Sequence, residues 1–241
     1  MLYDFMFKRK SIRKYSEKPL ENKTLKEIEE YSKTLTKLFP NIKTELKVIK
    51  SKDVKLVSSK APYYIAFFSE DKKGYLTNAG FMLEQMDLFL SSNAIGSCWI
   101  GVGSPVKEIE NKFDLKFVIL LAFGNAEEKL YRENLSEFNR KSIEQVSNID
   151  NELMQIVRLC PSAMNSQPWY FNQINNEIDV YICKNNIVKN LMLAKKNEID
   201  IGIALCYMWL VSKNENTNIE FTTKYKKEIP KCEYVITAII K

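Results

Sequence analysis

A short polar segment from Arg158 to Phe171 (RLCPSAMNSQPWYF) carries the side chains best suited to binding a small molecule. Pro161 and Pro168 have no backbone N–H and a fixed φ, so the segment is predicted to form a rigid turn between a helical pattern and a strand pattern. Side chains that donate and accept hydrogen bonds lie between the prolines: Ser162, Asn165, Ser166 and Gln167. Such a turn suits a planar heterocycle whose edge carries both donors and acceptors.

A second group of reactive or binding side chains lies near the start, in residues 7–20 (FKRKSIRKYSEKPL). Arg9, Lys10 and Arg13 place three cations around Ser11. Charge-assisted donors beside a hydroxyl are what a phosphate dianion requires. The alternative is a solvated basic surface, which is common for so short a motif. Together with the proline-bracketed turn, the phosphate interpretation is favoured.

A third candidate follows a buried helix. Apolar residues recur at helical spacing from Ala79 to Leu90, and the next segment, Gly96–Gly101 (GSCWIG), is predicted to be a tight loop. Its glycines allow a ligand to approach the backbone closely. For Trp99 itself we favour packing into the core, and for the loop backbone we favour ligand contact.

The three segments resemble the FMN-dependent nitroreductases, in particular small members with an APSAxNxQPW loop. The basic run resembles the family's RRSIRxF-like start, and Gly96–Gly101 resembles its GxGSCWxG-like loop. The resemblance implies that FMN is held at its phosphate by Arg9, Lys10, Ser11 and Arg13, beside its ring by Ser97, Cys98, Trp99, Ile100 and Gly101, and along its ring and ribityl chain by Pro161, Ser162, Ala163, Met164 and Asn165, with Gln167 and Trp169 bracing the loop. Residues 124–134 (GNAEEKLYREN) resemble the family's GYPxE…R stretch, which adds Lys129 and Arg132 as phosphate candidates, with a solvated turn as the equal alternative.

The activity implied by this resemblance is two-electron transfer. NADH or NADPH would reduce FMN, and a nitroaromatic, quinone or similar small-molecule acceptor would reoxidise it. Hydride transfer needs no side-chain acid or base, so we assign no catalytic residue and no metal. The alternative from another class is a non-catalytic flavin-binding or basic nucleic-acid-binding module. The many tyrosines and the positive charge favour it, but the aromatic residues sit in apolar runs rather than between cations.

Composition narrows the chemistry further. The chain of 241 residues contains no histidine, which excludes Ser-His-Asp and Cys-His catalysis and His-ligated metals. Its 36 Lys and Arg against 30 Asp and Glu give a mild net charge of +6, which suits anionic small ligands and argues only weakly for nucleic acid. The five cysteines form no CxxC pair, and neither a signal peptide nor an apolar run long enough for a membrane is visible. We therefore expect a cytoplasmic protein with reduced thiols.

Helical and strand patterns mix without βαβ regularity, which predicts an α+β fold with a mainly antiparallel central sheet flanked by helices, as in nitroreductases. Helices are expected over 22–40, 78–90, 142–159 and 201–211. Strands are expected over 45–50, 62–69, 117–123, 170–174, 178–183, 219–223 and 233–240. The run PYYIAFFS at 62–69 is almost continuously apolar and is expected to be central.

Three short internal similarities, in the same order, suggest that the chain arose by duplication. Residues 9–12 (RKSI) recur as 140–143, 38–41 resemble 159–162, and 79–83 resemble 201–205. The halves would be residues 1–139 and 140–241, with chance similarity as the equal alternative. Because family members usually bind FMN where two subunits meet, such a chain would be a pseudo-dimer, although a homodimer stays open. We expect one FMN per chain, because the segment after Pro40 lacks the Asn-Ser-Gln-Pro-Trp continuation.

Overall fold

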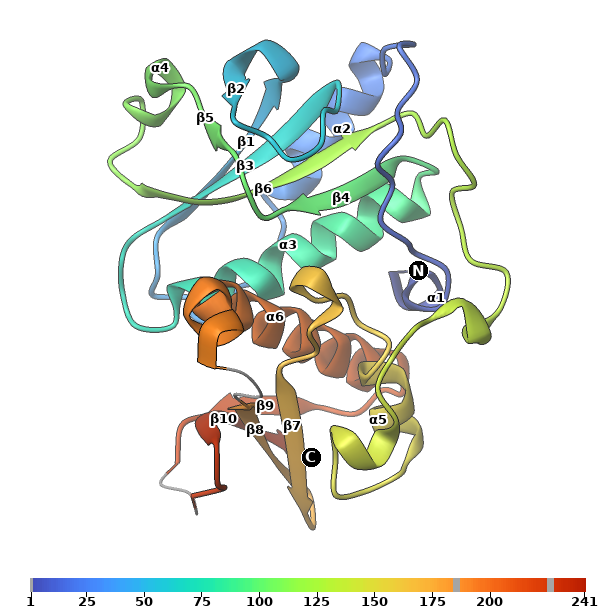
Figure 1. The fold of residues 1–241 in the computed structure, drawn as a ribbon, viewed down its shortest axis with the longest axis vertical. Helices are drawn as coiled ribbons and strands as arrows, with labels where there is room; N and C mark the ends of the chain where they lie inside the picture. The colour runs from blue at the N-terminus through green and yellow to red at the C-terminus, as the bar shows by residue number, and fades with distance from the viewer. Residues whose placement is uncertain (1, 184–186, 225–227) are drawn as a thin grey trace.

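The computed structural model describes residues 2–183, 187–224 and 228–241 and has the α+β architecture expected from the sequence. Two four-stranded antiparallel sheets enclose two long central helices, so the layers run sheet, helix, helix, sheet (Figure 1). The first sheet has the order β1 (Thr44–Lys50), β3 (Tyr63–Ser69), β6 (Lys116–Gly124), β4 (Gly96–Ile100), and the second has the order β7 (Trp169–Ile174), β8 (Glu177–Cys183), β10 (Cys232–Ile240), β9 (Ile219–Thr222). A small pair joins β2 (Val54–Lys55) to β5 (Ser104–Pro105). The helices are α1 (Leu2–Met6), α2 (Asn22–Ser32), α3 (Tyr75–Ser92), α4 (Lys107–Glu110), α5 (Glu152–Val157) and α6 (Ile187–Asn214).

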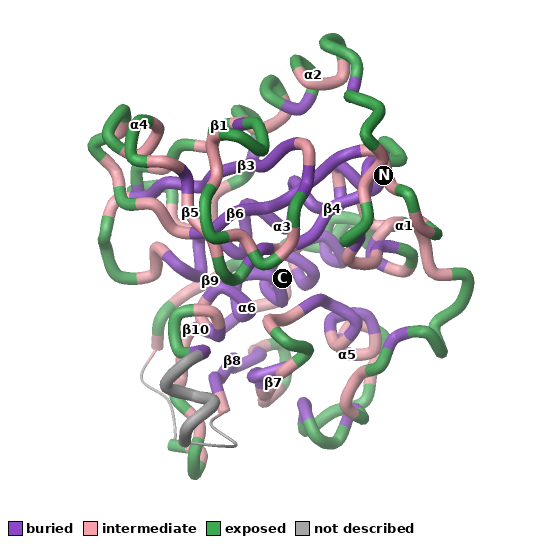
Figure 2. Tube along the Cα trace, turned by 45° about the horizontal axis from the view of Figure 1, so that its top comes forward, coloured by how far each residue is buried: buried purple, intermediate pink, exposed green. Residues whose placement is uncertain are grey.

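Strand β3 is buried on both faces, as its continuous apolar run predicts. Its side chains alternate between two clusters: Ile65 and Phe67 face the main core with the central helices, while Tyr64 and Phe68 join a smaller cluster on the outer face. The strand is therefore central, between β1 and β6. Figure 2 shows the burial concentrated in this sheet and the central helices, with α2 and α4 largely exposed.

The central helices α3 and α6 touch through two glycines. A Cβ on Gly80 would lie 2.0 Å from the carbonyl oxygen of Ile199, and a Cβ on Gly202 would lie 1.9 Å from that of Thr77. Only glycine permits backbones to approach this closely. The crossing therefore joins the two sheets into one body. It also fixes the position of the amino-terminal half of α6, which extends well before the predicted start at Ile201.

Two predicted helices are shorter in the structure. The first ends at Ser32 because the buried amide of Gln85 exchanges hydrogen bonds with the backbone of Thr36 and draws the chain away from the helix axis. The second, expected over 142–159, is reduced to α5 and a single turn at Ile143–Gln145. There the amide of Asn148 pairs with the backbone of Gln173, as a strand neighbour would, and the next helix starts only after the Asn151 cap.

The predicted loop Gly96–Gly101 is an edge strand, β4, over most of its length. It pairs with β6 from Gly96 opposite Gly124 to Ile100 opposite Leu120. A short apolar run between glycines does not distinguish a loop from a buried strand, which explains the error.

The expectation of five reduced thiols is also wrong. Cys183 and Cys232 face each other across β8 and β10 and form a disulfide. The other three cysteines are free and buried. Within the described residues, no helix has the length and apolarity needed to cross a lipid bilayer.

Candidate functional site

The basic amino-terminal run and the proline-bracketed turn meet at two adjoining cavities. The cavities have volumes of about 460 Å³ and 470 Å³. They share the lining residues Ser11, Arg13, Pro161, Ser162 and Met164. We call the first the β4 cavity, because residues 98–102 form one wall, and the second the arginine cavity, because Arg9, Arg13, Arg132 and Arg140 line it. Segments about 150 residues apart in the sequence thus form one composite site.

The amino-terminal run reaches this site as an extended segment beside β4. Ile12 donates its N–H to the carbonyl of Ser97 at 2.8 Å, which extends the first sheet by one short parallel bridge. Close approach requires Gly96, because a Cβ there would lie 2.8 Å from the Ile12 side chain. On the other side, Glu128 accepts the N–H of Arg13 at 2.7 Å. The backbone around Ser11 is therefore held from both sides.

The proline-bracketed turn has an unusual backbone. Met164, Asn165 and Gln167 all have left-handed φ, at 52°, 53° and 47°. Left-handed conformations are costly for residues other than glycine and tend to occur at functional sites. The Met164 side chain is 83% exposed at the rim shared by the two cavities. An exposed apolar side chain on a strained turn suits contact with a planar ligand.

Three side-chain contacts hold this turn. The side chain of Gln167 is buried and accepts the N–H of Lys141 at 2.8 Å, so it lies behind the turn. Arg140 donates to the side-chain oxygen of Asn165 at 2.8 Å. The carboxylate of Asp200 on α6 accepts the N–H of Ala163, at 3.0 and 3.1 Å to its two oxygens.

The arginine cavity holds more positive charge than its own acids balance. Of the described residues that line it, five are cationic and one, Glu137, is acidic. Burial, together with the like charges of Arg9 and Arg140, lowers the pKa of Arg132 to about 10. Burial also lowers the pKa of Arg140. A dianionic group placed here would relieve this repulsion, so the chemistry of the cavity suits a phosphate.

Arg9 has a different role from the one expected. Its side chain is buried, and its Nε lies 3.1 Å from the carboxylate of Asp87. Burial alone would lower the pKa of this guanidinium, but Asp87 and Glu84 outweigh it and the pKa is raised. Asp87 also accepts hydrogen bonds from Ser97 and Trp99. Arg9 therefore anchors the wall of the site and has little charge left for a ligand.

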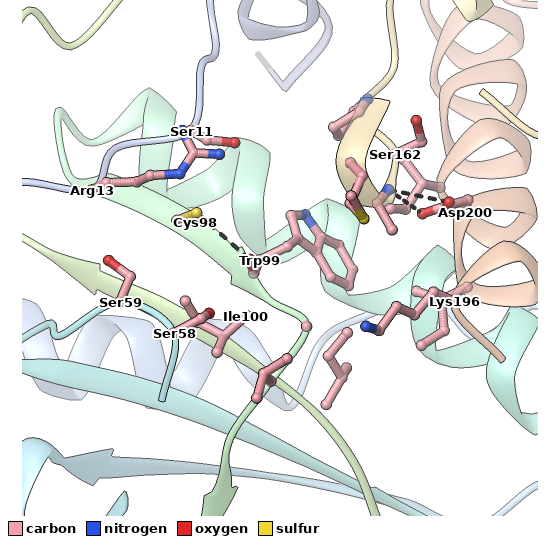
Figure 3. Close-up of a pocket in the computed structure, with 18 residues that line it drawn as sticks. Ser11, Arg13, Ser58, Ser59, Cys98, Trp99, Ile100, Ser162, Lys196 and Asp200 are labelled. Atoms are coloured by element: carbon pink, nitrogen blue, oxygen red, sulfur yellow. Dashed lines mark hydrogen bonds between the residues drawn. The ribbon is translucent and has the colours of Figure 1, made fainter. Parts of the chain in front are cut away.

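The β4 cavity is lined by backbone and by a few polar side chains (Figure 3). Cys98, Trp99 and Ile100 from β4 and the following Gly101 form one wall, with Ser58 and Ser59 beside Ile100, and Lys196 and Asp200 enter from α6 on the other side. Trp99 packs against the core, as favoured for this side chain, and also lines the cavity. The cavity thus offers a strand backbone and an open interior of the size that a flat ring system needs.

Some candidate residues lie elsewhere. Ser97 lies within β4, but its buried side chain donates to Asp87 on α3 and lines neither cavity. Lys129 pairs with Glu133 at 3.1 Å outside both cavities. Sequence reasoning missed Arg140, Lys196 and Asp200 as lining residues. Arg140 had a signal, because it begins the repeated RKSI segment. Lys196, Asp200 and Ile203 follow the i, i+4, i+7 spacing of one helix face, but the helix was expected to begin only after the first two.

The buried carboxyl of Asp200 leads to a stability prediction. Burial raises its pKa from 3.8 to about 8, so between these pH values the folded protein keeps a proton that the unfolded chain releases. The contribution of this group to stability is complete below pH 3.8 and is lost as the pH rises to about 8. We expect Asp200→Asn to gain stability relative to wild type across this range, with a slope approaching about 1.4 kcal/mol per pH unit.

Urea unfolding at several pH values measures this difference. The exposed Asp114→Asn is the matched control and should show no such pH-dependent difference. A difference between Asp200→Asn and wild type that stays constant with pH would show that Asp200 is ionised in the folded protein.

Comparisons with known proteins identify the family and the fold. A family model described as "Putative TM nitroreductase" matches residues 1–212, and the chain therefore belongs to this nitroreductase family. A Thermotoga maritima crystal structure described as a "putative nitroreductase" superposes with a TM-score of 0.67 at 20% sequence identity. The match covers 99% of this chain and 93% of that chain, so the two share the same fold.

Two shorter structures match part of the chain. An FMN-dependent nitroreductase from Clostridium difficile R20291 has a TM-score of 0.46 at 18% identity, with coverage of 59% of this chain and 95% of its own. A "Putative NADH Oxidase" from Clostridium acetobutylicum has a TM-score of 0.44 at 17% identity, with coverage of 59% and 97%. No curated protein matches the sequence. The described residues contain no group of three or more Cys, Asp or Glu side chains that could hold a metal ion.

Proposed function

We propose that this nitroreductase-family protein binds FMN and passes hydride from NADH or NADPH to a nitroaromatic, quinone or similar acceptor. The observation that carries the proposal is the union of two distant segments at one pair of cavities. The basic run and the proline-bracketed turn line both cavities, one of which is cationic and the other walled by strand backbone. FMN has the matching parts: a phosphate dianion joined to a planar ring.

The residues present fit this cofactor. Arg13, Arg132 and Arg140 would hold the phosphate together with Ser11 and Lys10, since the arginine cavity has unbalanced positive charge. Residues 98–101 and 161–164 would border the ring in the β4 cavity. When bound, the flavin supplies hydride acceptance and release at N5. The chain's own contribution is to bind and orient the ring and to limit the access of water.

We further propose that residues 1–139 and 140–241 are duplicated halves with one flavin site. Gly80 on α3 and Gly202 on α6 meet at the helix crossing. Two residues before each glycine, a side-chain oxygen accepts a backbone N–H from a proline-containing loop: Asn78 from Phe39, just before Pro40, and Asp200 from Ala163, two residues after Pro161. The two acceptors occupy corresponding positions, which supports an approximate two-fold relation between the halves, although the two donors are offset within their loops.

In the first half of the chain, the region that would correspond to the β4 cavity has little room for a second flavin. Six residues before Gly202 is Lys196, and six residues before Gly80 is Gly74. A Cβ on Gly74 would lie 2.6 Å from the Phe39 ring, so this ring fills the equivalent space. Arg140, which corresponds to Arg9 in the repeated RKSI segment, lines the same arginine cavity as Arg9 and so does not form a second phosphate site. This arrangement supports a stoichiometry of one FMN per chain.

Reconstitution with FMN tests the proposal. We expect a yellow protein with one flavin per chain and oxidation of NADH or NADPH when 1,4-benzoquinone or nitrobenzene is added. A bound but inert flavin would indicate a passive carrier, and absence of flavin binding would reject the proposal. Two flavins per chain would contradict the single-site hypothesis. Analytical ultracentrifugation of the loaded protein distinguishes a pseudo-dimeric monomer from a homodimer.

A further inference from the structure

Asp200 is a buried acid at a place where the proposed chemistry has no assigned proton source. Asp200 is the one residue with a carboxyl group among the described residues that line the β4 cavity. Its side chain is 3% exposed and enters the cavity from α6, next to the proline-bracketed turn (Figure 3). Burying a carboxyl group is costly. A structural reason or a chemical one must therefore account for it.

The structural reason does not require an acid. At the corresponding position of α3, Asn78 accepts a backbone N–H at 3.1 Å, that of Phe39 just before Pro40, while Asp200 accepts that of Ala163, two residues after Pro161. An amide oxygen is thus sufficient to hold a proline-containing loop in the first half. The acid occurs in the half whose turn lines the cavity. The difference between Asn and Asp at matched positions points to chemistry rather than to loop anchoring.

The hydrogen-bond geometry leaves a donor available. One N–H, that of Ala163, lies 3.0 Å from one carboxyl oxygen and 3.1 Å from the other. A single N–H needs only one acceptor, so a protonated carboxyl can keep this bond through one oxygen and donate through the other.

We propose that Asp200 donates the proton that accompanies hydride delivery to the acceptor in the β4 cavity. The inference rests on the proposed function, which supplies the hydride. With a quinone, the hydride brings two electrons and one hydrogen to the substrate, and the Asp200 O–H bond breaks to protonate the second oxygen, giving hydroquinone and a carboxylate. With a nitroaromatic, hydride and proton convert the nitro group to a nitroso group and water. Water at the cavity mouth then returns a proton to Asp200.

The surroundings keep this proton in place at neutral pH. Burial raises the pKa of Asp200 to about 8, while the N–H of Ala163 and the charge of Lys196 act in the opposite direction. The other titratable groups near it are Cys160, from the segment after α5, and Arg13 and Cys98 on the facing walls of the cavity. A carboxylic acid with a pKa near the working pH is well matched to general-acid catalysis.

The test separates the two half-reactions in FMN-loaded wild type, Asp200→Asn and the exposed control Asp114→Asn. Rapid mixing with NADPH measures flavin reduction, and mixing of the reduced protein with 1,4-benzoquinone measures reoxidation. In wild type we expect reoxidation to decline above about pH 8. In Asp200→Asn we expect reoxidation to be slower on the order of 10²-fold and to lack this decline, with reduction nearly unchanged. Asp114→Asn should match wild type in both steps.

A second readout does not depend on turnover. The infrared difference spectrum between flavin-free wild type and Asp200→Asn should contain the carbonyl band of a protonated carboxyl group, which fades as the pH passes about 8. Taking the difference separates Asp200 from the buried Glu84, whose pKa burial also raises. If the difference spectrum contains no such band, Asp200 does not hold a proton and the inference fails.

The remaining outcomes also decide the question. Equal reoxidation rates in Asp200→Asn and wild type overturn the inference and leave the proposed function intact. Equal slowing of both half-reactions, with weaker FMN binding, would assign Asp200 a positioning role and also overturn it. A wild-type protein that binds no flavin rejects the proposed function, and this inference with it.

Discussion

Replacement of Arg13 by Ala and Arg132 by Gln in one chain is expected to weaken FMN binding by a factor on the order of 10² to 10⁴. Each charge-assisted hydrogen bond to a phosphate contributes about 1.5 to 3 kcal/mol, and the double variant removes two such donors from the arginine cavity. Arg13 is exposed, and Arg132 is half-buried beside other cations, where burial and like charges lower its pKa. Neither is an apolar core residue, so neither change leaves a void in the hydrophobic core. Fluorescence quenching of FMN measures the dissociation constant.

Riboflavin gives the discriminating control, because it has the ring without the phosphate. Its affinity should be nearly the same in wild type and variant. A second control, Lys18→Ala with Lys26→Ala, removes two exposed cations away from the cavities and should leave FMN binding unchanged. FMN affinity in wild type should also decrease with added salt, and less steeply in the arginine variant. Undiminished FMN binding in the arginine variant would show that the phosphate lies elsewhere.

Local sequence patterns were sufficient to find the two segments that form this site. Prolines, amides and clustered cations indicate turn and anion chemistry without knowledge of their neighbours. The apolar run of β3 likewise predicted a central strand, which the structure confirms. Features of this kind depend on residues close together in the chain, and for them sequence reasoning worked.

Roles that depend on distant partners were not accessible in this way. Arg9 stands in a cationic run typical of a phosphate site, but Asp87, far along the chain, already neutralises its guanidinium. Helix 142–159 has a helical apolar pattern, but the amide of Asn148 finds a strand partner 25 residues later. In both cases a tertiary contact outweighs a local preference, and no local pattern records that contact.

The acidic and basic residues of α6 were missed for a related reason. A helix between two sheets is apolar on most faces, so its pattern was recognised only from Ile201 to Val211, where all residues but Trp209 are buried. Lys196 and Asp200 look like ordinary surface positions in the sequence. They are recognised as lining residues only when the β4 cavity is known, and that cavity depends on α3 and α6 crossing in one defined position.

Gly202→Val tests that crossing and is expected to destabilise the fold severely. The new Cβ would lie 1.9 Å from the carbonyl oxygen of Thr77 and 2.7 Å from the N atom of Phe81. These are backbone atoms of α3 and cannot rotate away, so the helices must separate. Overpacking of a core typically costs 1–3 kcal/mol, and a backbone clash belongs at or above the upper end, which lowers the Tm by about 10 °C or more.

Thermal unfolding followed by circular dichroism measures this effect, with Gly101→Ala as the matched control. A Cβ on Gly101 would meet only the flexible end of Lys196, 3.2 Å from Nζ, so its Tm should stay within about 2 °C of wild type. Because α6 carries Lys196 and Asp200 into the β4 cavity, any folded fraction of Gly202→Val should also bind FMN poorly. A Gly202→Val protein with the wild-type Tm and wild-type FMN affinity would mean that the two helices do not cross at these glycines, and the geometry of the whole site would then need revision.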